Sequence, residues 1–251
     1  MDPVHVLGGG LAGCEAAQQL ARLGIPVRLW EMRPGRSTGA HDTPHLSEMV
    51  CSNSLGSDVP TTAAGVLKAE LRLLSCQLLE AADACRVPAG GALAVDRDAL
   101  ALEVEGRLAA YPEVEIVRAE AHSLRPDGAQ RTIAATGPLT SEALAGELAA
   151  ATGAEHLFFY DAIAPIVDDG SVDHDALFRA SRREPDAPGD YLNVPLDKAA
   201  YEAFVDGLLE ADRVEPHPFE ELRLFEGCQP IEAIASRGRE SLRFGPMRPV
   251  G

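Results

Sequence analysis

The fold of this chain is decided by its first strand and turn, Val4-His5-Val6-Leu7-Gly8-Gly9-Gly10-Leu11-Ala12-Gly13-Cys14-Glu15-Ala16-Ala17. Three glycines of this stretch, Gly8, Gly10 and Gly13, match the pattern G-x-G-x-x-G. The first glycine permits a tight turn, the second lets a phosphate approach the backbone, and the third lets the helix lie close to the strand. Free N–H groups and the helix dipole can then bind phosphate oxygens. The sequence therefore predicts a phosphate-binding turn made of Gly8, Gly9, Gly10, Leu11, Ala12 and Gly13.

A second predicted strand, 26–30, ends in Glu31, which lies 18 residues after Gly13. A carboxylate at this place can accept a hydrogen bond from a ribose 2′-hydroxyl, and it would repel a 2′-phosphate. The pattern therefore indicates FAD or NAD rather than NADP. The alternative is a glycine turn in an ordinary strand–helix–strand unit, with an exposed Glu31. We favour the dinucleotide site because strand, turn, helix and acid agree.

Composition indicates a globular protein without an obvious membrane or secretion signal. The chain has 251 residues, of which 46% are hydrophobic, enough for one large domain or two smaller ones. It contains no apolar run long enough to span a bilayer and no signal-peptide pattern at its start. Its five cysteines are scattered and form no C-x-x-C pair. Reduced thiols in a cytoplasmic protein are the expectation, without a zinc site or disulfide framework.

The net charge of −17 argues against non-specific nucleic-acid binding over the whole surface. A local exception is the segment 236–251, which has four arginines against one acid, Glu240. This segment could meet a phosphate backbone. Alternatively, its arginines balance the acidic remainder through surface ion pairs.

The rest of the chain alternates between predicted strands and helices. Residues 32–60 lack periodicity, and we expect an ordered loop folded over a ligand. Helical spacing predicts one long helix over 61–84, capped by Thr61 or Thr62. Further strands are expected at 92–95, 114–117, 132–135 and 191–196, and further helices at 96–110, after Thr140 or Ser141, and at 198–209.

The strand 132–135 runs into Thr136 and Gly137. In open α/β folds, ligands bind at the carboxyl ends of the strands, so this hydroxyl and bare backbone are candidates for cofactor contacts. A plain strand–turn–helix connection explains the same residues equally well.

Two cysteines, Cys51 and Cys228, stand in loop-like contexts beside polar residues or glycine. A thiolate in such a setting can add to an electron-poor carbon, although most free cysteines are small buried packing residues. We expect Cys14 to be a packing residue. His41 and His45 have the spacing of a metal pair, but Pro44 disfavours a helix there and no ligand set is completed, so no metal site is predicted.

In its motifs the chain resembles the bacterial folate- and FAD-dependent tRNA (uracil-5-)-methyltransferases. The blocks that carry this resemblance extend from the first residues to the last and include 7–17, 31–34, 50–58, 87–97, 135–141, 159–167, 225–232 and 242–251. The resemblance implies a Rossmann-like FAD-binding domain at 1–160 and an inserted second α/β domain for substrate and tRNA at 161–251. Because members of the family are longer, we expect this chain to be an amino-terminal portion that is incomplete at its C-terminus.

The resemblance also implies a reaction. FAD is reduced by NADH or NADPH, methylenetetrahydrofolate supplies the carbon, and C5 of a uridine in the tRNA T-loop becomes methylated. Cys228 would be the nucleophile towards uracil, and Cys51 would assist as a base or protect the flavin intermediate. The arginines from Arg237 to Arg248 would contact the tRNA.

Two other functions remain open from the residues. One is an FAD- or NAD-dependent thiol oxidoreductase in which Cys51 and Cys228 form a redox pair. The missing C-x-x-C speaks against it, and a reversible two-electron thiol titration would support it. The other is a non-catalytic nucleotide-binding fragment, which a purified protein without flavin colour or turnover would favour.

Overall fold

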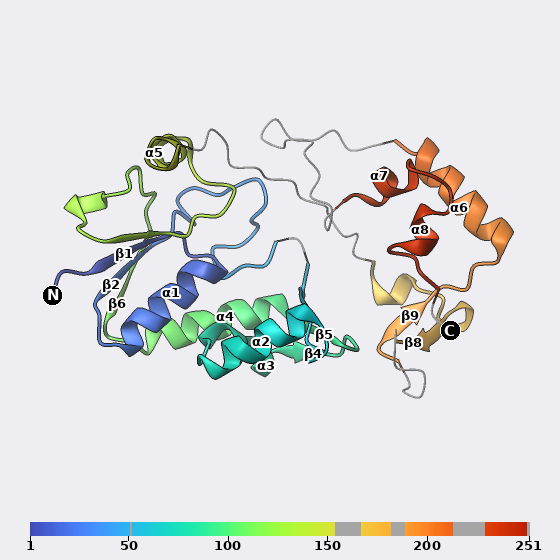
Figure 1. Ribbon diagram of the computed structural model, residues 1–251, viewed down its shortest axis with the longest axis horizontal. Helices are drawn as coiled ribbons and strands as arrows, with labels where there is room; N and C mark the ends of the chain where they lie inside the picture. The colour runs from blue at the N-terminus through green and yellow to red at the C-terminus, as the bar shows by residue number, and fades with distance from the viewer. Residues whose placement is uncertain (51, 154–166, 182–188, 213–228, 250–251) are drawn as a thin grey trace. The chain divides into compact units, whose positions relative to one another are not determined.

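The computed structural model describes residues 1–50, 52–153, 167–181, 189–212 and 229–249. The chain divides into two compact units (Figure 1). Unit 1 contains Met1–Val87 and Gly91–Phe159, and unit 2 contains Pro88–Gly90 and Tyr160–Gly251. Cys51 and Cys228 lie outside the described residues.

Unit 1 is built on a parallel sheet of four strands in the order β6-β2-β1-β7. The strands are β1 (Val4–Leu7), β2 (Val27–Trp30), β6 (Val114–Val117) and β7 (Thr132–Ala134). Each lies where the sequence predicts it. Parallel neighbours require crossover connections, and these supply helices to the sheet. The Rossmann-like α/β fold expected for this part of the chain is confirmed.

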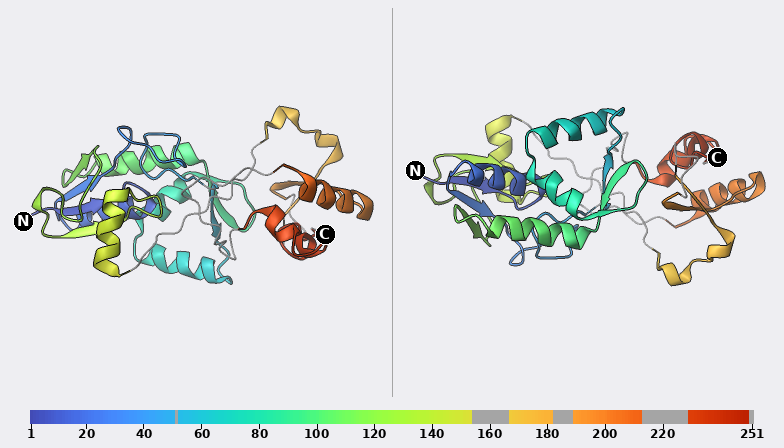
Figure 2. Two further views of the ribbon diagram at one scale, coloured as in Figure 1. Left: turned by 90° about the horizontal axis from the view of Figure 1, so that it is seen from above. Right: turned by 90° about the horizontal axis from the view of Figure 1, so that it is seen from below.

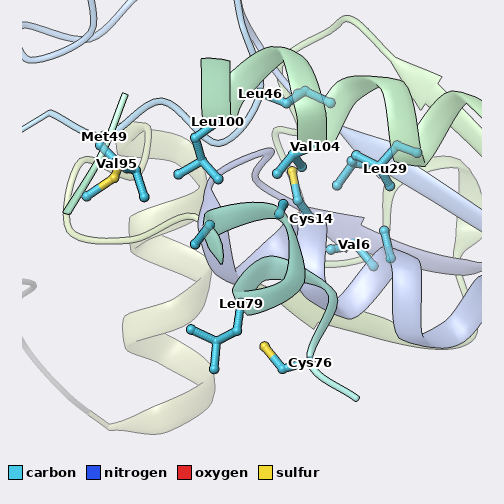
Figure 3. Packing of buried hydrophobic residues seen from close by; sticks show 14 of the residues in the cluster. Val6, Cys14, Leu29, Leu46, Met49, Cys76, Leu79, Val95, Leu100 and Val104 are labelled. Atoms are coloured by element: carbon cyan, nitrogen blue, oxygen red, sulfur yellow. The ribbon is translucent and has the colours of Figure 1, made fainter. Parts of the chain in front are cut away.

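Helices cover both faces of the sheet (Figure 1). Along β1 and β2 the side chains alternate, so that Val6 and Leu29 face one layer and Leu7 and Trp30 face the other. The first layer holds the main core (Figure 3) and is formed by α1 (Leu11–Arg22), α3 (Gln77–Ala84) and α4 (Arg97–Ala109). The second layer is formed by α5 (Glu142–Thr152), which begins after Ser141 as predicted.

The single helix expected over 61–84 is wrong, because two helices occupy this stretch. The helix α2 (Ala63–Leu73) is capped by Thr62, whose side chain accepts the N–H of Gly65. The chain then turns at Ser75, which has a left-handed φ of 57°, before α3 begins. The carboxylate of Glu15 on α1 accepts the N–H groups of Gln77 and Leu78 at 3.1 and 2.7 Å. This distant cap satisfies donors that a continuous helix would have bonded internally.

A small antiparallel sheet of three strands, in the order β3-β5-β4, completes unit 1. Its strands are β3 (Ser54–Ser57), β4 (Arg86–Val87) and β5 (Ala92–Val95), and a short 3₁₀ turn, η1, spans Pro126–Gly128. The loop expected over 32–60 therefore contains a strand that the sequence did not predict. Its polar side chains and its glycine give no strand signal, and pairing with β5 is what makes it extended.

Unit 2 combines a two-stranded antiparallel sheet with helices. Its elements are η2 (Asp169–Ser171), η3 (His174–Ala176), β8 (Phe178–Ala180), β9 (Tyr191–Asn193), α6 (Lys198–Glu210), α7 (Ile231–Ala235) and α8 (Ser241–Phe244). Buried Val205, Ala235 and Leu242 join the three α-helices, which stay together in both views of Figure 2. The strand expected over 191–196 is shorter than predicted. Among the helices in the described part of the chain, none is both long and apolar enough to cross a membrane.

Candidate dinucleotide-binding site

Two glycines of the pattern, Gly8 and Gly13, have no room for a side chain. Gly8 has a φ of +101°, and a Cβ on it would lie 2.6 Å from the carbonyl oxygen of Ala135. A Cβ on Gly13 would overlap the carbonyl oxygen of Gly8. Both positions therefore require glycine for the reasons expected from the sequence: a tight turn and close packing of α1 on its strand.

The second glycine of the pattern, Gly10, faces open space. Gly10 is the N-cap of α1, with an ordinary φ of −77° and no side-chain cap, and a Cβ placed on it meets nothing within 4 Å. The N–H groups of Leu11 and Ala12, in the first turn of α1, have no acceptor within the helix. An uncapped helix start beside free space is the arrangement that a pyrophosphate occupies, so these residues fit a dinucleotide.

The end of β7 lies directly beside this turn. The N–H of Ala135 donates to the carbonyl oxygen of Leu7 at 2.8 Å, and the Cα of Thr136 would be 2.8 Å from a Cβ on Gly8. Gly137 follows with a left-handed φ of +67°. The structure thus brings Ala135 and Thr136 to the glycine turn, and Gly137 follows Thr136 in the chain. The hydroxyl of Thr136 already forms a hydrogen bond with that of Thr140, at 2.6 Å.

Glu31 is buried at the end of β2, with 6% of its surface exposed, so the alternative of an exposed Glu31 is wrong. Its Oε1 accepts the backbone N–H and Nε of Arg33 at 2.9 and 3.0 Å. Its Oε2 accepts the N–H of Gly9 and Nη2 of Arg33, both at 3.1 Å. These four donors fill the usual acceptor positions of a carboxylate. A ribose hydroxyl that reaches Glu31 must share or replace one of them.

The pKa of Glu31 lies below its usual value. Burial by itself would raise this pKa, but the hydrogen bonds and positive charge of Arg33 and the N–H of Gly9 outweigh burial. The carboxylate is therefore ionised at neutral pH, as hydrogen bonding to a ribose hydroxyl requires.

Arg33 is a site residue that the sequence analysis did not single out. Its guanidinium is buried and binds Glu48 as well as Glu31, with Nη1 2.6 Å from Oε2 of Glu48. The same Nη1 donates to the carbonyl oxygen of Thr43 at 3.3 Å. A basic residue two positions after the acid that follows the second strand was the available signal.

A second set of contacts, centred on Glu105, holds the loop that follows β2 against α4. Glu105 accepts the N–H of Leu46 at 2.9 Å and Nη2 of Arg118 at 3.0 Å, and it lies 3.1 Å from Nδ1 of His45. The N–H of Ser47 donates to the carbonyl oxygen of Gly9 at 2.8 Å. The loop around Ser47 is therefore ordered and lies against the glycine turn.

The described thiols of unit 1 are packing residues. Cys14 is fully buried, and burial raises the pKa of its thiol to about 11, so the thiol stays protonated. Cys76 is also buried, and burial raises its pKa. In the part of the chain that the structure describes, no three His, Cys, Asp or Glu side chains form a group that could hold a metal.

Comparison with known proteins assigns the family. The family model described as "Glucose inhibited division protein A" matches residues 3–250. The chain is 52% identical over 251 residues to a Syntrophomonas wolfei protein named methylenetetrahydrofolate–tRNA-(uracil-5-)-methyltransferase TrmFO, covering 100% of this chain and 57% of that protein. A protein of the same name from Anaeromyxobacter dehalogenans is 55% identical over 248 residues, which are 99% of this chain and 55% of that protein.

The chain thus spans about half the length of the curated relatives it matches. Among solved structures, GidA from Aquifex aeolicus is similar over 49% of this chain and 20% of the GidA chain, with 19% sequence identity. The TM-score is 0.39, which is too low to support an argument. The family model covers nearly all of the chain, including the glycine turn, Glu31 and Thr136. The chain therefore belongs to the glucose inhibited division protein A family.

Proposed function

We propose that this chain contributes the FAD site of a folate- and FAD-dependent tRNA (uracil-5-)-methyltransferase. The observation that carries the proposal is the identity of 51–55% over nearly the whole chain to proteins named for that activity. The glycine turn and its uncapped helix support FAD binding independently of these names. In this proposal, residues 1–160 form the FAD-binding domain, and residues 161–251 belong to an inserted domain for substrate and tRNA.

Each part of the site has a task in holding the cofactor. The N–H groups from Gly10 to Gly13 bind the pyrophosphate, and the carboxylate of Glu31 accepts a ribose hydroxyl. In this proposal, Thr136, which lies next to Gly8, and the following Gly137 contact the cofactor from the end of β7. FAD held by these residues would supply the redox chemistry, with NADH or NADPH as its reductant and methylenetetrahydrofolate as the source of the carbon.

The protein's own chemistry is assigned to two thiols outside the described residues. The thiolate of Cys228 adds to C6 of uracil, and the electrons of the C5–C6 double bond make C5 nucleophilic. After C5 has bonded to the carbon unit, the thiolate of Cys51 takes the C5 proton. The electrons of that C–H bond form a double bond from C5 to the transferred carbon, which breaks the bond of that carbon to its carrier. Addition of a hydride from the bound reductant to this carbon makes the methyl group, re-forms the C5–C6 double bond and releases the Cys228 thiolate.

The proposed substrate is a uridine in the T-loop of tRNA, and the proposed location is the cytoplasm. The thiol oxidoreductase alternative gains no support from the names of the relatives. No pair of thiols in the described part of the chain is disulfide-bonded, since Cys14, Cys76 and Cys85 are all free.

The test is carbon transfer from labelled methylenetetrahydrofolate to a T-arm RNA hairpin, with FAD and NADPH present. We expect label to appear in 5-methyluridine with the unaltered chain and to be abolished by Cys228→Ala. Cys85→Ala is the matched control, because Cys85 is a free thiol at the end of α3 far in sequence from both proposed thiols. Label transfer by Cys228→Ala at the normal rate would disprove the nucleophile, and no transfer by the unaltered chain would disprove the activity for this chain.

A further inference from the structure

We propose that the exposed side of α8 in unit 2 binds single-stranded RNA by stacking an unpaired base on Phe244 next to Arg243. The proposal rests on the proposed function, because it names the surface that holds the RNA substrate. It starts from the way α8 packs. Leu242 is fully buried against Val205 and Ala235, and this turns the following Arg243 and Phe244 outward.

Phe244 is 77% exposed, which is unusual for a large aromatic side chain. The guanidinium of Arg243 lies 5.7 Å from the centre of its ring. An aromatic face with an arginine beside it is the combination on which proteins stack unpaired bases, since every base has a π face and the arginine attracts the adjacent phosphate. A duplex does not offer free base faces, so the arrangement selects loops and single strands.

The charge of the segment agrees with this partner. Residues 236–249 carry four arginines and one acid in a chain whose net charge is −17. Arg243 pairs with Glu240 at 3.0 Å, and Arg239 pairs with Asp206 at 2.5 Å. Both pairs have more than two-fifths of each side chain exposed, so they are weak and can exchange an acid for a phosphate. Arg237 is exposed in the same turn.

Phe204, another exposed aromatic in the described part of unit 2, lacks this combination. Phe204 on α6 is 42% exposed, and its helix carries the acids Glu202, Asp206 and Glu210. Acidic neighbours repel phosphate. Phe204 therefore serves as the matched control for Phe244, because both are exposed phenylalanines on helices of unit 2.

The experiment measures binding of a fluorescein-labelled T-arm RNA hairpin to the full 251-residue chain by anisotropy, with FAD absorbance recorded on the same samples. We expect Phe244→Ala to weaken RNA binding about 5-fold or more, and Phe244→Trp to restore it, because stacking depends on the aromatic face. Phe204→Ala should bind as the unaltered chain does. Arg243→Gln should lower the slope of log Kd against log salt by about 0.7 to 0.9.

The outcomes separate this surface from the proposed function. Equal RNA binding by Phe244→Ala and the unaltered chain would overturn the surface, whatever the flavin data show. Equal losses in Phe244→Ala and Phe204→Ala would also overturn it, because the effect would then not belong to the arginine-flanked ring. No RNA binding by the unaltered chain overturns the surface, and FAD binding or carbon transfer in those samples then decides the proposed function separately. If an RNA duplex without a loop binds as tightly as the T-arm hairpin, base stacking on Phe244 is overturned.

Discussion

The guanidinium of Arg33 donates a hydrogen bond to each oxygen of the Glu31 carboxylate, with Nε 3.0 Å from Oε1 and Nη2 3.1 Å from Oε2. Both side chains are almost completely buried. Through Nη1 the same guanidinium reaches Glu48, 2.6 Å away. Arg33 therefore joins the acid at the end of β2 to the loop that lies against the glycine turn.

Replacing Arg33 by methionine should strongly destabilise unit 1. The change keeps an apolar stem but leaves Glu31 buried without a cation, and breaking a buried pair in this way costs about 3–5 kcal/mol. Urea denaturation followed by circular dichroism measures the loss. The matched control is Arg36→Met, because Arg36 pairs with Glu120 on the surface and should leave the free energy of unfolding near that of the unaltered chain. Similar losses in both variants would contradict the importance given to the buried pair.

The stability contributed by the Glu31 carboxylate should disappear in acid. Its folded pKa lies below the unfolded value of 4.5, so the contribution is fully present above about pH 4.5 and is lost as pH falls through the folded pKa. Glu31→Gln should therefore be less stable than the unaltered chain at neutral pH, and the gap should narrow in acid. Urea titrations at several pH values measure the difference. A gap that stays constant from neutral pH into this acid range would contradict the depressed pKa.

Gly10→Val should abolish flavin binding while leaving the fold intact. Gly10 has an ordinary φ, and a side chain on it meets no protein atom, so only a ligand would clash with it. Gly13→Val is the contrasting variant: its side chain would overlap the Gly8 carbonyl, and the fold itself should be lost. Thermal melting and flavin absorbance of both variants test this. Normal flavin content in a folded Gly10→Val protein would refute the phosphate-binding turn.

Glu15→Gln should destabilise the chain by about 1 kcal/mol, because a charged acceptor is removed from the first N–H groups of α3. Urea denaturation measures the change. Glu142→Gln is the control: Glu142 lies in the first turn of α5, and among the described residues it accepts no N–H from the start of another helix. If the two substitutions have the same effect, Glu15 is not the cap of α3.

The strands of the parallel sheet and the glycine turn were predictable because their signals are local. Each strand is a short, largely apolar run, and Gly8 and Gly13 are required by the backbone around them. The break between α2 and α3 was not predictable from periodicity. Leucines continue at helical spacing across it, and the group that caps the start of α3 is Glu15, more than sixty residues earlier in the chain.

The same distinction applies to the site. Glu31 could be found from its distance to the glycines, and Thr136 from the strand that precedes it. Neither the burial of Glu31 nor the ion pair of Arg33 with Glu48 could be found, because both depend on how a loop without periodicity folds back. Contacts of Arg33 and Arg118 fix that loop, and such contacts leave no repeating pattern in a sequence.

The central claim is that the glycine turn holds FAD, and a titration of the purified chain with FAD tests it most directly. The account predicts saturable binding, with the flavin absorption band near ~450 nm shifted in the bound state and one FAD bound per chain. It also predicts that Gly10→Val shows no such binding. Absence of any bound flavin with the unaltered chain, or equal binding by both proteins, would contradict the account.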